Sequence, residues 1–156
     1  MPAFSFSGEP KRGPFWKQIL NGEKTMTTRH VRKAGGPRIG QTAHLYWKQR
    51  TPADKKPIHL IGRSKIVSVK RYRNMKSLLL SLRVKGALEY IKAEGFADLR
   101  ELVEWWTGES PSGYGVMNGG ILLDGDVWEA FEASGPIEII QWTYPLTIKE
   151  AQPCVT

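Results

Sequence analysis

The feature that most constrains the fold is a change of hydrophobic period near residue 73. The chain before it is rich in β-branched and aromatic side chains, and the chain after it places apolar side chains three and four positions apart. The patterns predict a strand over residues 42–47, and one long strand or a strand pair over 58–62 and 65–72. They predict helices over 75–82, 87–93, 97–106 and 127–133, and a closing strand over 137–144. Because the helices follow one another without intervening strands, the order favours an α+β fold over alternating βαβ units.

The N-terminal part adds one short helix and one extended segment. Apolar side chains at helical spacing predict a helix over residues 15–20, and Asn21-Gly22 is a typical stop. Residues 26–29 are short and β-branched, which predicts an extended segment. Residues 1–14 and the Gly/Ser/Pro cluster at 108–120 predict irregular structure. Gly62 predicts a bulge, and Ala97 or Asp98 marks the start of its helix.

Length and composition indicate one ordinary domain. The chain has 156 residues, of which 40% are hydrophobic, so it is long enough to bury a core. Its apolar runs are too short to cross a bilayer, and residues 1–5 lack the features of a signal peptide. A single cysteine, Cys154, supports neither a disulfide framework nor a metal cluster. We therefore expect a single domain over residues 1–156, no membrane partner and a cytoplasmic location.

The basic residues are concentrated in one half of the chain. Residues 11–76 hold 18 of the 23 lysines and arginines and only two acids, whereas the rest holds five bases and 13 acids. This segregation predicts a positive face, which attracts phosphates and releases their counterions on binding. It favours a polyanion or nucleotide partner over a basic surface that serves solubility alone.

The segment Gly22-x-Lys24-Thr25-x-Thr27-x-Arg29, directly after the predicted short helix, resembles the defining motif of ASCH domains. Further matches follow in order: Ile39-Gly40 before a strand, Val69 to Tyr72, Ala93 to Phe96, and an aromatic strand around Trp142. The resemblance covers about residues 14–145. It departs at Gln41, where the family usually has an acid, and at 113–126, which is longer than in the smallest members. The resemblance implies a PUA-like β-barrel with helices packed on one side.

Small amidohydrolases of the ASCH family remove the acyl group from N-acylated cytidines with a lysine base, a threonine nucleophile and a glutamate acid/base. By resemblance these catalytic roles fall on Lys24, Thr27 and Glu94. The residue types suit the chemistry, because a partly buried lysine can act as a base near neutral pH and activate a neighbouring hydroxyl. The alternative is that Lys24 and Arg29 hold phosphate, Thr27 pairs across strands, and Glu94 is a solvated helix residue.

Residues predicted to bind nucleic acid or ligand combine bases, aromatics and one hydroxyl. Arg29 is suited to a two-pronged hydrogen bond with a carbonyl or phosphate, and aromatics beside bases suit stacking on single-stranded nucleic acid. The set is Thr25, Arg29, Arg32, Lys33, Tyr46, Lys48, Lys70, Arg71, Tyr72 and Arg73. Each aromatic is also a candidate for the core, and Trp105-Trp106 is interpreted as a core anchor. The histidines lack metal-ligand spacing, so neither a metal nor another cofactor is expected.

Three classes of function remain open on the sequence. The first is a module that binds RNA, or a modified base within it. The second is a hydrolase, acting on the amide of an N-acylated cytidine or, as a variant, on single-stranded RNA. The third is an accessory domain that binds DNA or protein. The charge pattern favours an RNA ligand over a free nucleoside. The expected partner is RNA or a modified nucleoside, and the sequence leaves the natural substrate and the oligomeric state open.

Overall fold

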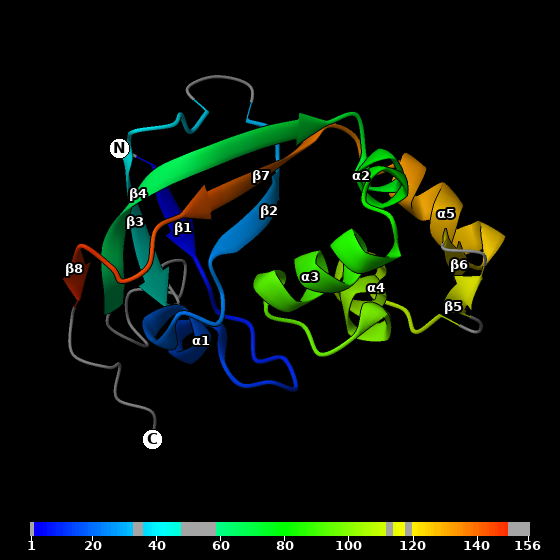
Figure 1. The fold of residues 1–156 in the computed structure, drawn as a ribbon, viewed down its shortest axis with the longest axis horizontal. Helices are drawn as coiled ribbons and strands as arrows, with labels where there is room; N and C mark the ends of the chain where they lie inside the picture. Colours follow the sequence, from blue (N-terminus) through cyan, green and yellow to red (C-terminus); the bar gives the residue numbers. More distant parts are fainter. Residues whose placement is uncertain (1, 33–35, 48–58, 112–113, 118–119, 150–156) are drawn as a thin grey trace, which may run out of the picture.

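The computed structural model describes residues 2–32, 36–47, 59–111, 114–117 and 120–149. Its elements follow the order strand, helix, strands, helices, strands (Figure 1). The strands are β1 (Ala3–Ser5), β2 (Met26–His30), β3 (Thr42–Trp47), β4 (His59–Tyr72), β5 (Tyr114–Met117), β6 (Gly120–Leu123), β7 (Ile137–Trp142) and β8 (Ile148–Lys149). The helices are α1 (Phe15–Asn21), α2 (Met75–Ser81), α3 (Val84–Glu94), α4 (Leu99–Thr107) and α5 (Gly125–Glu132).

One curled, mixed sheet forms the body of the molecule. Its strand order is β1-β3-β4-β7-β2, with β8 added to β4, and the pairs are antiparallel except for the parallel pair β1–β3. The long strand β4 runs across the whole sheet, while α2, α3, α4 and α5 lie together on one side (Figure 1). β5 and β6 form a separate hairpin near α5. The class is therefore α+β with a barrel-like sheet, as predicted.

The barrel has an open seam between its two edge strands, β1 and β2. Among the described residues, no backbone pairing joins these strands. Two guanidinium groups bridge the seam instead: Arg29 donates to the Ser5 carbonyl oxygen at 2.9 Å, and Arg32 donates to the Ala3 carbonyl oxygen at 3.2 Å. Carbonyl groups on an edge strand are thus satisfied by side chains rather than by a neighbouring strand.

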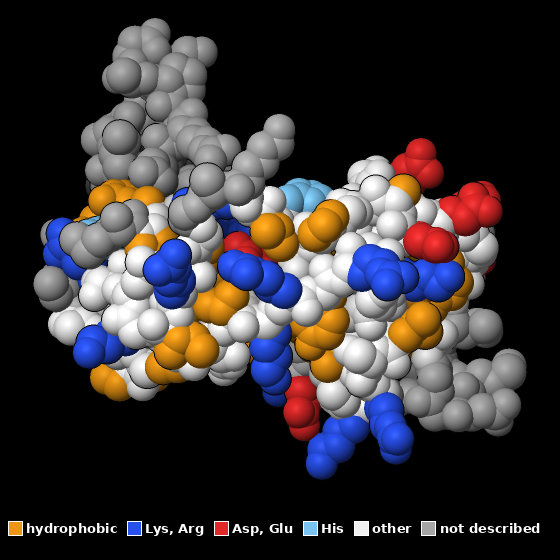
Figure 2. All heavy atoms as spheres, turned by 90° about the horizontal axis from the view of Figure 1, so that it is seen from above, with side chains coloured by type: hydrophobic (Ala, Val, Ile, Leu, Met, Phe, Trp, Pro, Cys, Tyr) orange, Lys and Arg blue, Asp and Glu red, His pale blue; other side chains and the backbone are white. Residues whose placement is uncertain are grey.

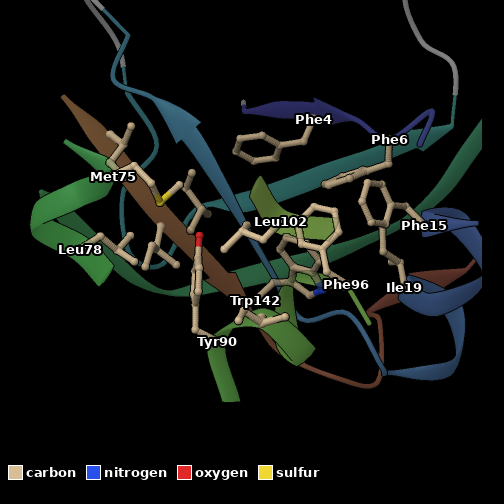
Figure 3. Packing of buried hydrophobic residues seen from close by; sticks show 14 of the residues in the cluster. Phe4, Phe6, Phe15, Ile19, Met75, Leu78, Tyr90, Phe96, Leu102 and Trp142 are labelled. Carbon is tan, nitrogen blue, oxygen red and sulfur yellow. The ribbon is translucent and has the colours of Figure 1, made fainter. Parts of the chain in front are cut away.

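The core lies between the curled sheet and the helices. Figure 3 shows buried aromatic rings from β1, α1 and the α3–α4 turn packed beside aliphatic side chains of α2 and α4. Phe15 packs edge-on against Phe6 and Phe96, with ring centroids 6.5 Å and 5.9 Å apart. Such edge-to-face packing ties the N-terminal strand to helices that follow it by more than 70 residues.

Local signals explain where the helices begin and end. The side chains of Asn74 and Asp98 accept hydrogen bonds from the backbone N–H groups of Ser77 and Glu101, so they cap α2 and α4. Gly95 ends α3 with φ of +100°, a conformation that glycine adopts without a side-chain clash. Its amide hydrogen-bonds to the Lys92 carbonyl, and α3 therefore stops directly after Glu94.

Most predicted elements are present, and two details differ. Residues 3–5 form β1 rather than an irregular lead-in, and residues 114–117 form β5 within a segment predicted to be a loop. The residues around Gly62, predicted to form one long strand or a strand pair, form one strand with a register shift opposite Leu45/Tyr46 at the predicted bulge. β1 has only three residues and pairs in parallel with β3. Because its partner is distant in sequence, no local pattern predicts this strand.

The position of Gly95 gives a test of the close approach between α1 and the α3–α4 turn. A Cβ atom at Gly95 would lie 2.9 Å from Gln18 Oε1 and 3.0 Å from Phe15. We expect Gly95→Ala to lower the free energy of unfolding by about 2–4 kcal/mol, from backbone strain and overpacking together. Urea denaturation measures the change.

The matched control is Gly108→Ala, at another helix C-cap with φ of +78° and nothing within 4 Å of the added Cβ. This variant carries the backbone strain alone, so it should lose only about 1–2 kcal/mol. Equal losses for the two variants would contradict the close approach at Gly95.

Candidate functional site

The turn after α1 places Lys24 at the open seam. Gly22 ends α1 with φ of +84°, and the carbonyl oxygen of Gln18 accepts from the amides of both Glu23 and Lys24. The chain then enters β2 at Met26, with Lys24 two residues before the strand. The Asn-Gly pair thus ends the helix and directs the chain into the extended segment that borders the site.

Lys24 is buried and makes an ion pair with Glu94. Only 2% of its surface is exposed, and its Nζ lies 3.3 Å from Glu94 Oε2. Nζ also donates to the carbonyl oxygens of Met26 at 2.9 Å and Glu94 at 2.5 Å. An ammonium group has three protons, so each has an acceptor. The ring of Phe15 lies 4.5 Å from Nζ and adds a cation–π contact.

The electrostatic environment of Lys24 favours its neutral form relative to water. Burial lowers its pKa below the ordinary value of 10.5, because the charged amine loses its hydration. The carboxylate of Glu94 opposes this shift by attraction and hydrogen bonding, and the nearby Arg29 adds to it by repulsion. Lys24 is therefore an amine that releases its proton more readily than a surface lysine.

Glu94 is held on its other oxygen by a chain of two hydroxyl groups. Thr28 donates a hydrogen bond to Glu94 Oε1, and the Thr28 and Tyr90 hydroxyl oxygens lie 2.6 Å apart. All three side chains are buried. Burial and the negative charge of Glu94 raise the pKa of Tyr90 well above its ordinary value, so its phenol keeps its proton.

Thr27 faces a different cation. Its hydroxyl oxygen accepts a hydrogen bond from Arg29 Nε at 3.0 Å, and Thr27 is 4% exposed. The Arg29 guanidinium also lies over the rings of Phe6 and Phe4, 5.0 Å and 5.7 Å from their centroids. The aromatic contacts and the bond to Ser5 fix the guanidinium in place, where its charge would stabilise negative charge on the Thr27 oxygen.

Of these groups, Lys24, Thr27, Thr28, Arg29 and Glu94 line one cavity of about 430 Å³, whose lining includes residues of both edge strands, β1 and β2. The lining combines polar side chains with a set of aromatic rings, here called the aromatic wall. The polar side is formed by Ser5, Ser7, Lys24, Thr27, Thr28, Arg29, His30 and Glu94, and the remaining lining residues are Phe6, Gly8, Phe15, Phe96, Trp105 and Trp106. A cavity of this size and mixed lining is typical of a small-molecule site.

The structure thus brings together the three residues predicted to be catalytic, together with Arg29, in one cavity. Of residues 24–29, which are expected to line a cleft opposite the helix after Glu94, positions 24 and 27–29 line the cavity together with Trp105 and Trp106 of α4. In a simple catalytic triad, the lysine base would contact the threonine nucleophile directly. Here Lys24 contacts Glu94, and Thr27 contacts Arg29.

Other residues predicted to bind ligand lie away from this cavity. Thr25 is half-buried, and its carbonyl accepts from the Trp142 amide. Arg32 is exposed and bridges the seam to Ala3. The remaining members lie on β3, on β4 or just after it: Tyr46 and Tyr72 are half-buried, and Lys70, Arg71 and Arg73 are exposed. Lys33 and Lys48 lie outside the described residues.

The contact between the Thr28 and Tyr90 hydroxyl groups is not predicted from the sequence, and one tryptophan is assigned to the wrong environment. Thr28 is the motif residue between Thr27 and Arg29, and Tyr90 is one helical turn before Glu94, so the i, i+4 spacing from Tyr90 is the available signal. The interpretation of Trp105 as a core anchor is wrong. Its side chain is 54% exposed, and its ring forms part of the cavity wall against Phe15, 5.4 Å away.

Neither a metal cluster nor a membrane-spanning helix is found in the described part of the chain. Within the described ranges, no group of three or more His, Cys, Asp or Glu side chains is placed to hold a metal ion. Nor does any helix among these residues have the length and hydropathy needed to span a membrane.

Comparison with known proteins gives one distant likeness. No family model matches the sequence, and no curated protein matches it. Two solved structures of ZmASCH from Zymomonas mobilis, each of a different point mutant, superpose with TM-scores of 0.40 and 0.39 at 14% identity. The alignments cover 92% and 98% of this chain and 70% and 73% of those chains. These neighbours bear the name of the family that the motif resembles, and a likeness at this level carries no argument about chemistry.

The charges around Lys24 predict that its pKa shifts in opposite directions in two variants. Glu94→Gln removes the attraction that favours the ammonium, so the pKa of Lys24 should fall further. Arg29→Gln removes a repulsion, so the pKa should rise. The pH titration of the Lys24 side-chain ¹³Cε signal measures both changes.

A Lys24→Met variant identifies the signal, and the exposed Lys17 of α1 serves as an internal control whose titration should not move. Shifts of the same sign in the two variants would show that general loosening of the site, rather than the local charges, sets the protonation of Lys24.

Proposed function

We propose that the cavity binds a modified nucleoside and hydrolyses the amide bond of an N-acylated cytidine. The observation that carries the proposal is the placement of a buried amine, a hydroxyl and a carboxylate around one cavity, with Lys24, Thr27 and Glu94 as its members. The resemblance of the segment to the ASCH motif implies the same three roles. The cavity volume of about 430 Å³ suits a nucleoside-sized ligand.

In the proposed reaction, the Thr27 oxygen attacks the acyl carbonyl carbon and its proton passes to the neutral amine of Lys24. The Arg29 guanidinium, which already donates to Thr27 Oγ1, stabilises the negative charge that develops there. The lowered pKa of Lys24 supplies the neutral amine that this step requires.

Glu94 completes the proton transfers. Its carboxylate contacts Lys24, so it accepts a proton from the ammonium and passes it to the departing exocyclic nitrogen of cytidine. The C–N bond breaks, cytidine leaves, and the acyl group remains as an ester on Thr27. Water then attacks the ester, and the same carboxylate accepts its proton. The C–O bond to Thr27 breaks and a carboxylic acid is released. The proton on Glu94 returns through Lys24 to the Thr27 oxygen, which restores the starting state.

The aromatic wall gives the cavity its affinity for a planar ligand. Phe6, Phe15 and Phe96 are buried, whereas Trp105 on α4 is half exposed at the cavity side. The His30 and Trp106 rings meet edge-on with centroids 5.5 Å apart. Rings at an accessible cavity wall suit stacking on a base.

Substitution of the three residues tests the hydrolase. Lys24→Ala and Thr27→Ala should each reduce kcat/KM on N-acylated cytidine by at least about 10²-fold, because a nucleophile and its base act as one device. Glu94→Gln keeps the size of the side chain but cannot carry the proton, so it should lower kcat more than it raises KM. Liquid chromatography of released cytidine measures the turnover, and circular dichroism checks the fold.

The control is Thr42→Ala, which removes a half-buried threonine hydroxyl on β3 outside the cavity and should leave turnover unchanged. Wild-type turnover in Thr27→Ala would exclude Thr27 as the nucleophile. A parallel assay with labelled single-stranded RNA separates the alternatives, because cleavage of RNA without amide hydrolysis would favour a ribonuclease.

A second function, binding of single-stranded RNA, rests on the exposed bases at the end of β4. Lys70 and Arg73 are exposed, and Arg71 is also exposed but donates from Nε to the buried carboxylate of Glu138 at 3.2 Å. Figure 2 shows lysine and arginine side chains spread along one face of the molecule, with acidic side chains gathered toward the end that carries α5. RNA is the polyanion that suits this distribution together with a nucleoside cavity.

The RNA interaction should weaken steeply with salt, because each neutralised phosphate contributes about 0.7 to the logarithmic slope for a single strand. Reversing Lys70 and Arg73 to glutamate should flatten that slope by about one to two. Arg71 is left intact, since its removal would leave Glu138 buried without its partner. Fluorescence anisotropy over a salt series measures the slope.

Reversal of Lys85 and Lys92, two exposed lysines on α3, is the matched control for total charge. The same flattening in both variants would show that net charge alone governs the interaction. Absence of RNA binding at low salt would exclude this second function and leave the hydrolase unaffected.

A further inference from the structure

The hydroxyl groups of Thr28 and Tyr90 form a chain whose direction the structure fixes. Thr28 has one hydroxyl proton, and it is donated to Glu94 Oε1. The contact of 2.6 Å between the Thr28 and Tyr90 oxygens therefore needs the Tyr90 proton. The direction is Tyr90 to Thr28 to Glu94, and both hydrogen bonds stabilise the negative charge on the carboxylate.

The opposite oxygen of Glu94 is engaged by the Lys24 ammonium. Oε2 faces Nζ at 3.3 Å and takes the proton that Lys24 passes on, so a proton that arrives from water goes to Oε1. Oε1 already accepts from Thr28, so the Thr28 hydroxyl must first turn and become an acceptor. Thr28 then donates toward Tyr90, and the Tyr90 hydroxyl has to turn its own proton away.

We infer that Thr28 and Tyr90 are positioning residues that set when Glu94 takes up and releases a proton. They act as a two-hydroxyl relay that reverses direction as the carboxyl group changes its charge. The inference rests on the proposed hydrolase for its use in catalysis, where Glu94 must gain and lose a proton in every cycle. The relay itself is a property of the three buried side chains.

Few other described side chains can influence the protonation of Glu94. The described charged or titratable side chains that face it are Lys24, from the segment before β2, Arg29 and His30, which share its cavity on β2, and Tyr90 on its own helix. From α1 and α4 the cavity-facing side chains are aromatic: Phe15, Trp105 and Trp106. The relay contacts Glu94 Oε1, whereas Lys24 contacts Oε2.

The test is a pH titration of the Glu94 side-chain ¹³Cδ signal in protein labelled with ¹³C-glutamate, with Glu94→Gln to identify the signal. Thr28→Val keeps the shape of the side chain and removes the donor, so the midpoint should move to higher pH by about one unit. Tyr90→Phe should move it in the same direction by less, because Thr28 still donates. Thr28→Ser restores the hydroxyl and should restore the wild-type midpoint.

A catalytic readout accompanies the titration. In the hydrolase assay, Thr28→Val should lower kcat at least about tenfold and change KM little, while Thr28→Ser recovers kcat. The His30→Gln variant controls for the imidazole that shares the cavity and should leave the carboxyl midpoint in place.

An unchanged midpoint in Thr28→Val, or an equal shift in Thr28→Ser, overturns the relay. If Thr28→Val does not fold, Tyr90→Phe decides, and a midpoint equal to that of the wild type overturns the inference. The titration needs no substrate. A relay confirmed in a protein without amidohydrolase activity would therefore refute the proposed function alone, and the converse result would refute the relay alone.

Discussion

The ion pair between Lys24 and Glu94 is the interaction on which the rest of the site depends. Both side chains are buried, so each charge would be strongly destabilising without the other. The pair joins the segment before β2 to the end of α3, 70 residues further along the chain. It therefore fixes the distance between the sheet edge and the helical layer, and that distance defines the cavity. The stability of the site and the proposed hydrolysis depend on the same two charges.

The two cations of the motif, Lys24 and Arg29, have different partners. Lys24 neutralises Glu94, and Arg29 holds Thr27 while reaching across the seam to Ser5. Alternation along β2 explains this division, since Thr27 and Arg29 lie on one face of the strand and Thr28 on the other. One short strand thus supplies a hydroxyl that is stabilised by a guanidinium and another that serves a carboxylate.

Much of the fold could be predicted because its strands and helices carry strong periodic patterns. The helix at 99–107 follows from its capping aspartate and amphipathic spacing, and the bulge follows from Gly62. β1 could not be predicted, because three residues in parallel pairing have no local signature. At the site, the motif predicted Lys24, Thr27 and Arg29, and helix-end context predicted Glu94. Tyr90 and the cavity role of Trp105 depend on how α3 and α4 meet the sheet, which no single segment encodes.

The open seam between β1 and β2 has a mechanical consequence. A closed barrel resists expansion because every strand is tied to two neighbours by a ladder of backbone hydrogen bonds. Here the described edge strands are joined through the side chains of Arg29 and Arg32 instead. Separating them would break two guanidinium–carbonyl hydrogen bonds and no ladder bond, so the seam is the line along which the sheet would part most easily. Arg29 also lines the cavity, so the side chain that holds the seam together is also part of the site.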